Sequence, residues 1–211
     1  ASQQDILDIC KEKMLFTTNT SLNDIELEKE LSIYKTKKEY FSYMLLANEL
    51  LTNNIEIALV SDHHTIDGID KLERAILICK AMKPFKVHTE VILGVEISCA
   101  DKNHVVGIFD KNSKKKINDW LKNNLVSKQD GAFITSLDVL KAIYSMGGIG
   151  YIAHIDTSNI LKNDVMNGAY KNKLFTSQVS QILGIKNLGN RNNISIKLQK
   201  YTIIKKKLNS Y

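Results

Sequence analysis

Short apolar runs that end at polar residues, with helical segments between them, constrain the fold of this chain most. The runs are rich in Ile, Val and Leu, which is typical of strands, and lie at residues 55–60, 91–97, 104–109 and 147–154. Other segments carry apolar residues at three- and four-residue steps, which predicts helices at residues 37–51, 69–82, 114–121 and 136–145. Strands separated by helices predict an α/β fold of parallel β/α units. The carboxyl ends of such strands meet at one face, where active sites are built.

Composition narrows the class of protein but does not name a function. The chain has 211 residues, 44% hydrophobic and 25% charged, which is typical of a globular protein. No run of about 18 apolar residues occurs, so no membrane span is expected. Its three cysteines are far apart and form no CxxC pair, which argues against a disulfide framework and a zinc ribbon and favours the cytoplasm. The net charge of +6 is compatible with a phosphate-bearing partner.

Potential metal ligands recur beside the apolar runs. His63 follows the first run, Glu96 lies inside the second, His104 begins the third and His154 ends the fourth. Neutral imidazole binds Zn, Mn or Fe, and a carboxylate adds charge and can bridge two ions. Such a cluster would suit the hydrolysis of a phosphoester by metal-activated water.

Each of these residues also has an ordinary structural explanation. His63 can be a hydrogen-bonded group at a strand end, His104 can simply begin a strand, and Glu96 can pair with a lysine. Burying a carboxylate within an apolar strand is costly without a partner, which favours the ligand interpretation of Glu96. Lysine runs at 114–116 and 205–207 can contact nucleic-acid phosphates or form solvated faces.

Three ordered segments resemble the PHP (polymerase and histidinol phosphatase) superfamily. The segment IALVSDHHT at 57–65 resembles its "TDH" motif, and LGVEIS at 93–98 with HVVG at 104–107 resembles its "GvE…H" motif. The segment GIGYIAH at 148–154 resembles its "iAHp" motif, with Ile155 in the place of the usual proline. The resemblance covers roughly residues 55–156.

This resemblance implies a fold and a set of roles. The fold would be a distorted (β/α)7-type PHP barrel, incomplete or degenerate here, whose strand ends hold up to three divalent ions. His63 would bind one ion, while Glu96, His104 and His154 would hold another, with Glu96 bridging to a third. Asp62 would orient the cluster, and Asp62 with His63 would act in catalysis by positioning water or a second ion.

Two departures from the family pattern reduce the expected number of ions. The paired histidines with which the family begins are absent, and Leu15 and Thr17 stand in their places. The late DxH motif is also absent, since no histidine follows His154. We therefore expect a divalent metal, Mn, Zn or Fe, in fewer copies than the family's three.

The resemblance leaves two functions open, so whether the chain is an enzyme stays undecided. One is a metal-dependent phosphoesterase (a hydrolase) linked to nucleic-acid metabolism or defence, with a phosphoester substrate, nucleic acid as a candidate partner and an ATPase domain in the full-length chain. The other is a catalytically degenerate scaffold or interaction module of a larger ATPase. We expect a single PHP-like domain over 1–211, with a motif-bearing core at about 55–156, a helical part at 1–54 and a part of undefined fold at 157–211.

Overall fold

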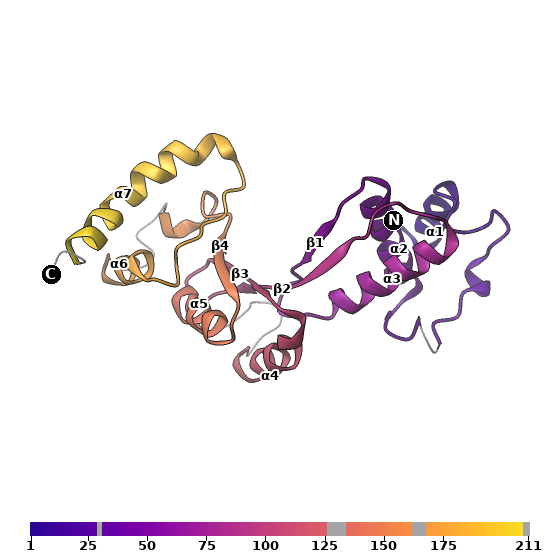
Figure 1. Ribbon diagram of the computed structural model, residues 1–211, viewed down its shortest axis with the longest axis horizontal. Coiled ribbons are helices and arrows are strands. Elements are labelled where there is room, and N and C mark those ends of the chain that lie inside the picture. The colour runs from indigo at the N-terminus through magenta and orange to yellow at the C-terminus, as the bar shows by residue number, and fades with distance from the viewer. Residues whose placement is uncertain (29–30, 126–133, 162–167, 209–211) are drawn as a thin grey trace. The chain divides into compact units, whose positions relative to one another are not determined.

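The computed structural model describes residues 1–28, 31–125, 134–161 and 168–208 (Figure 1). The chain forms two compact units, one of residues 1–60 and 67–92 and the other of residues 61–66 and 93–211. Among the described residues, no helix is both long enough and apolar enough to cross a membrane.

Three helices build the first unit, and the central one packs against both others. They are α1 (Gln3–Glu12), α2 (Lys37–Thr52) and α3 (Gly68–Met82). The start of α2 is set by Thr36, whose side chain accepts a hydrogen bond from the Glu39 N–H. Its end is set by Asn53 and by Asn54, whose φ of 55° is tolerated by asparagine. The fully buried side chains include Leu7, Phe41, Met44, Leu51 and Leu72.

An antiparallel sheet builds the second unit. Strand β2 (Glu90–Ser98) enters it from the first unit, where β1 (Ile57–Val60) lies, and β3 (His104–Phe109) and β4 (Ile149–Ala153) follow. β3 pairs antiparallel with β2 and with β4, so that Glu96, Val106 and Tyr151 lie opposite one another in one row. The outer edge of β4 receives residue Leu183, which forms a parallel bridge with Ile152. The apolar sequence ILGI at 182–185 predicts a strand, and the structure has this single bridge there.

The second unit also contains helices, one of which packs on the sheet. They are α4 (Lys114–Asn124), α5 (Ser136–Ser145), α6 (Gly168–Thr176) and α7 (Arg191–Leu208), with short 3-10 turns at Leu22–Asp24, Lys111–Ser113, Asn159–Leu161 and Leu188–Asn190 elsewhere in the chain. Helix α5 packs on β3 and β4. It comes close because Gly107 and Gly150 face each other across the strands, and a Cβ on either would lie within 3.3 Å of Ile143.

The predicted barrel is wrong. The described strands form one open sheet in the order β1-β2-β3-β4, and the β2–β3 and β3–β4 pairs are antiparallel. The connection between β2 and β3, residues 99–103, is far shorter than the dozen or more residues that a parallel crossover needs. The sequence also predicts a short helix over 24–31, with Ser21 or Asn23 placed to cap it. This prediction is wrong over 25–28, where a turn at Leu22–Asp24 leads into non-helical backbone.

We expect Gly148→Ala to destabilise the protein by about 1–3 kcal/mol, the usual cost of overpacking. A Cβ at Gly148 would lie 2.5 Å from the Phe109 ring and 2.9 Å from the Ile108 carbonyl oxygen. Gly168→Ala is the matched control, because a Cβ there has nothing within 4 Å and alanine suits a helix. Urea unfolding followed by circular dichroism measures both variants, and equal midpoints would contradict this packing.

Candidate metal centre

The four predicted ligands come together at one end of the sheet in the second unit. Glu96 lies near the end of β2, His104 is the first residue of β3, and His154 follows the last residue of β4. Ser98, His104 and Ala153 occupy one row of the antiparallel register. The end of β2, the start of β3 and the end of β4 therefore meet. The ligands gather because the strands are antiparallel, and the expected meeting of parallel carboxyl ends is not the reason.

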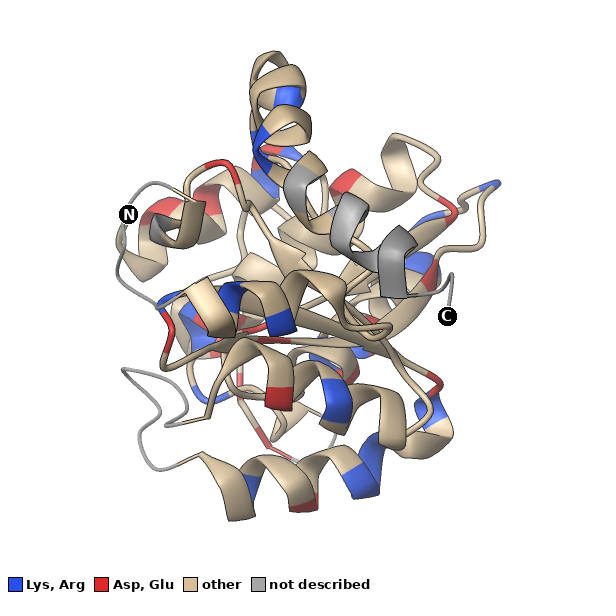
Figure 2. Cartoon of the chain, turned by 90° about the vertical axis from the view of Figure 1, so that its left-hand side faces the viewer, with Lys and Arg blue, Asp and Glu red and all other residues tan. Residues whose placement is uncertain are grey.

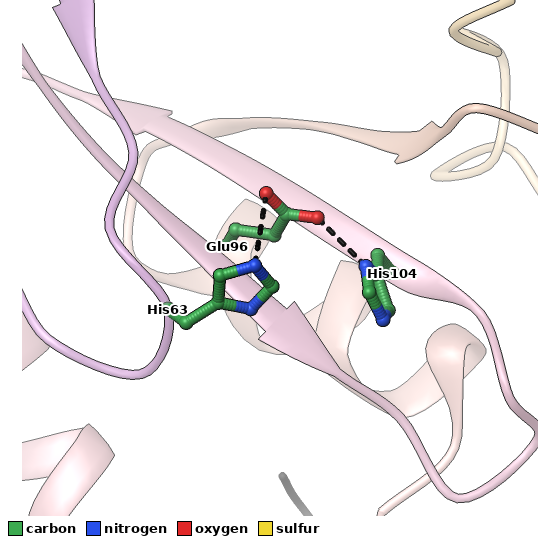
Figure 3. Close-up of side chains that lie close together, drawn as sticks. All are labelled: His63, Glu96 and His104. Carbon is green, nitrogen blue, oxygen red and sulfur yellow. Dashed lines mark hydrogen bonds and ion pairs between the residues drawn. The ribbon is translucent and has the colours of Figure 1, made fainter. Parts of the chain in front are cut away.

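The Glu96 carboxylate lies at the centre of the cluster (Figure 3). Its Oε1 is 2.8 Å from Nδ1 of His104 and 3.5 Å from Nε2 of His154, while its Oε2 is 3.7 Å from Nε2 of His63. The ligand atoms of His63, Glu96 and His104 all lie within 4.8 Å of one another. The Glu96 side chain is 17% exposed and that of His63 is 58% exposed. The two carboxylate oxygens thus face different imidazoles.

Three of these atoms form a tight triangle. Besides the two distances from Glu96 Oε1, Nε2 of His154 lies 3.2 Å from Nδ1 of His104. Ligand atoms bound at about 2.0–2.1 Å to one tetrahedral zinc ion lie about 3.3–3.4 Å apart. The sides of the triangle, 2.8, 3.2 and 3.5 Å, bracket that spacing. Glu96, His104 and His154 therefore have the donor types and the spacing of a three-ligand metal site.

A parallel bridge attaches His63 to Glu96. The main-chain N–H of Glu96 donates to the carbonyl oxygen of Asp62 at 3.0 Å, and that of His64 donates to the carbonyl oxygen of Glu96 at 2.9 Å. The half-buried Asp62, predicted to act in catalysis, thus holds β2 through its main chain. Among the described residues, the cluster of potential ligand atoms contains His63 but not the Asp62 carboxylate.

His64 has a structural role that the sequence does not reveal. Its side chain is only 5% exposed, and its Nε2 accepts a hydrogen bond from the Ser98 N–H at 3.0 Å. This bond fixes the segment after β1 to the end of β2. His64 has a φ of 58° and His154 a φ of 35°, both in the left-handed region, which costs about 1–3 kcal/mol each. Both of these strained positions lie beside the cluster.

A buried polar network supports the loops that carry His104 and His154. Asn103, 1% exposed, accepts a hydrogen bond from the Ser158 hydroxyl and donates one to Ser136 Oγ at 3.0 Å. Asp101, 2% exposed, accepts from Ser136 Oγ at 2.6 Å and from the Tyr170 hydroxyl. The turn before His104 and the segment after His154 are thereby joined. In the sequence these residues look like ordinary turn residues.

Other predicted positions lie apart from the cluster. His88 follows Pro84 in a lysine-rich stretch, which predicts a surface residue. It belongs to the first unit, is exposed, and lies with Nδ1 3.2 Å from Nζ of Lys80. On α4, Lys116 donates to the carbonyl oxygen of Ser145 at 3.1 Å, and Lys115 is exposed. The side chains of 205–207 lie outside the described residues. Figure 2 shows Lys and Arg positions and Asp and Glu positions interspersed along the ribbon.

Comparison with known proteins finds a relative with clear sequence similarity. A protein of Streptococcus pneumoniae serotype 4 (strain ATCC BAA-334 / TIGR4) is 38% identical over 174 residues, which cover 80% of this chain and 67% of the pneumococcal protein. The chain belongs to the family of that protein. The relative is described as an uncharacterized protein, so its description assigns no activity to the family. No family model matches the chain. No solved structure matches it.

For this family member we expect His64→Leu to lower the free energy of unfolding by about 1–3 kcal/mol, because the partly buried Ser98 N–H loses its acceptor. His64→Gln is the matched control, since the glutamine amide oxygen reaches about as far as Nε2 and can accept the same bond. Urea unfolding compares the two variants with the wild type. A leucine variant as stable as the glutamine variant would show that this hydrogen bond is unimportant.

The carboxylate of Asp156 gives a pH-dependent prediction. Hydrogen bonds from the main-chain N–H groups of Lys186 (2.8 Å) and Asn187 (2.9 Å) and from Asn190 Nδ2 (3.1 Å) lower its pKa from 3.8 to about 2, with Lys186 contributing most. A folded-state pKa below the unfolded one gives stability that is present above pH 3.8 and lost as the pH falls through about 2.

Asp156→Asn should therefore lower the urea midpoint at pH 6, and the difference from the wild type should shrink between pH 4 and pH 2. Asp119→Asn, at an exposed position on α4, controls for the change in net charge. Urea unfolding at a series of pH values measures all three proteins. A difference between Asp156→Asn and the wild type that stays constant down to pH 2 would contradict the assignment.

Proposed function

We propose that this chain is a metal-dependent phosphoesterase domain related to the PHP superfamily, with one principal divalent ion at Glu96, His104 and His154. The observation that carries the proposal is the triangle of Glu96 Oε1, His104 Nδ1 and His154 Nε2, with sides of 2.8, 3.2 and 3.5 Å. The three sequence segments that resemble the superfamily support it, because the same residues occupy their ligand positions. Because the sheet is open and not a barrel, we propose only that the ligand segments are related to those of the superfamily.

The donor set favours Zn, Mn or Fe over Mg or Ca. Two imidazole nitrogens and one carboxylate oxygen suit these transition metals, whereas Mg and Ca prefer oxygen ligands alone. Three protein ligands leave a coordination position for water or substrate, as in catalytic zinc sites. A divalent ion held here would activate bound water and neutralise charge on a phosphoryl group.

His63 is suited to move protons at this centre. Its side chain is 58% exposed, and its Nε2 lies 3.7 Å from Glu96 Oε2, the oxygen that faces away from His104. An exposed imidazole at this position can accept a proton from the attacking water or give one to the leaving oxygen. Asp62 keeps its role as the residue that orients this segment, through its hydrogen bond with the Glu96 N–H.

A second candidate function is a non-catalytic scaffold within a larger ATPase. The observation in its favour is that Leu15 and Thr17 occupy the two positions where the PHP superfamily has its paired histidines. Leu15 is buried in the first unit, 2% exposed, and Thr17 bonds through Oγ1 to Thr20 Oγ1 at 2.9 Å. Neither residue can replace an imidazole, so a multi-ion centre is not proposed.

The wider setting of the proposal comes from the sequence. The net charge of +6 suits a phosphoester substrate at a nucleic-acid end, and an ATPase domain in the full-length chain is the proposed partner. We also propose a cytoplasmic location. The three cysteines are unpaired and buried, and burial raises the pKa of the Cys79 thiol to about 11, as is usual for structural cysteines in a reducing compartment.

Elemental analysis tests the metal centre. Protein purified without a metal-affinity step should contain about one Mn, Fe or Zn ion per chain. His104→Ala and His154→Asn should each lose it, while His88→Ala should keep it. Asparagine is chosen at 154 because it tolerates a positive φ, yet its amide is too short to place a ligand atom where Nε2 lies. No ion in the wild type after soaking in Mn or Zn would overturn the proposal and favour the scaffold.

Activity is then measured with p-nitrophenyl phosphate and bis-p-nitrophenyl phosphate. The ion-loaded wild type should hydrolyse one of them, and His63→Ala should lower kcat by about 10²-fold or more, the usual contribution of acid–base catalysis, while keeping the ion. An ion-loaded protein that hydrolyses neither ester would favour the scaffold.

A further inference from the structure

Tyr151 shares a face of the sheet with the predicted metal ligands. In the antiparallel register Glu96 of β2 lies opposite Val106 of β3, which lies opposite Tyr151 of β4. Residues directly opposite one another point to the same side of a sheet, and neighbouring strands are about 4.8 Å apart. The Cα atoms of Glu96 and Tyr151 are therefore about 10 Å apart, with both side chains on one face.

His104 completes this arrangement. It lies two residues before Val106 on β3, so its side chain also points to the face of Glu96 and Tyr151. Val106 is 3% exposed, whereas the three polar side chains around it are partly exposed. An apolar residue thus lies between two predicted metal ligands and one phenol. The metal centre itself does not use Tyr151, and nothing in the family resemblance assigns it a role.

The ring of Tyr151 is held in place from the edge of the sheet. A Cβ built on Gly184 would lie 3.2 Å from Cε2 of Tyr151, so the glycine backbone lies close against the ring. Gly184 is itself fixed, because its N–H donates to the carbonyl oxygen of Ile152 at 2.7 Å and its carbonyl oxygen accepts from the Ile155 N–H at 2.8 Å. The ring is therefore positioned before any ligand binds.

The hydroxyl of Tyr151 is available as a donor. Among the described residues, the structure records no hydrogen bond to it. Burial, together with the charge of Glu96, raises the pKa of Tyr151, so the phenol stays protonated at neutral pH. A neutral hydroxyl on the same face as the Glu96 carboxylate can donate to an anion without adding negative charge to the site.

We propose that Tyr151 is a substrate-binding residue, whose hydroxyl donates a hydrogen bond to a non-bridging oxygen of a phosphoryl group held beside Glu96 and His104. This inference rests on the proposed function and adds to it a recognition group on the strand opposite Glu96. The phosphate would lie over Val106. On one side of it are Glu96 of β2 and His104 of β3, and on the other side is the phenol of Tyr151 on β4.

The test uses inorganic phosphate as the probe and Tyr151→Phe as the variant, in the whole chain loaded with Zn or Mn. Isothermal titration calorimetry should show phosphate binding weakened about tenfold or more, the usual effect of one hydrogen bond to a charged group. The ion content should stay that of the wild type, because Tyr151 is not a ligand. Tyr144→Phe, which changes an exposed tyrosine on α5, is the matched control and should bind phosphate as the wild type does.

The outcomes separate the two proposals. Equal phosphate affinity for Tyr151→Phe and wild type would overturn the role of Tyr151 and leave the phosphoesterase proposal standing. A variant that loses the ion would overturn it too, since Tyr151 would then support the metal site instead. Wild type that holds an ion yet binds no phosphate would overturn both. Weaker binding by Tyr151→Phe alone, with Tyr144→Phe unchanged, would support the proposal.

Discussion

The second unit depends on how the charge of Glu96 is compensated. This carboxylate lies within a strand between the buried residues Val95 and Ile97, and its side chain is only 17% exposed. A partly buried carboxylate without a positive partner is costly, and here every close side-chain partner recorded for it is an imidazole. A divalent ion at the centre of the triangle of ligand atoms, as proposed above, would contact all three and offset the charge.

The rest of the unit holds these atoms in place. The Asn103–Ser158 hydrogen bond joins the turn before His104 to the segment after His154. His64 ties the segment that carries His63 to the end of β2, with its backbone in the left-handed region. A site assembled from four separate chain segments needs such cross-links, because each segment alone would leave its imidazole free to rotate. The need to hold these imidazoles in place thus accounts for both the buried hydrogen bonds and the strained backbone at this end of the sheet.

The sequence predicted the elements well and their arrangement poorly. Hydrophobic periodicity located β3 and α5 at the observed bounds and α2 and α3 to within a residue, because their apolar faces are strongly periodic. The expectation of parallel units failed, although the short connection at 99–103 already excluded a crossover between β2 and β3. The proximity of Glu96, His104 and His154 was nevertheless expected from the family resemblance, although a parallel sheet would have placed His104, at the start of β3, far from the end of β2.

Residues that act through long-range register left no local signal. Tyr151 became visible only when the pairing of β2, β3 and β4 placed it opposite Glu96, and alternation within one strand cannot give that pairing. The buried position of His64 was equally hidden, because a histidine after a strand usually faces solvent or a ligand. The residues in the network around Asp101 and Asn103 have the composition of a common turn.

The sequence lacks the paired histidines of the PHP superfamily but keeps Glu96, and both facts fit a centre with one ion. In a centre with several ions, both carboxylate oxygens of Glu96 would be needed as ligands. Here Leu15 is a core residue of the first unit and supplies no donor atom, and Oε2 of Glu96 faces His63 at 3.7 Å. Under the proposed function, one oxygen would bind an ion with His104 and His154, while the other faces the exposed imidazole of His63. A reduced ligand set of this kind would still provide an electrophile and an acid–base group on opposite sides of a single carboxylate.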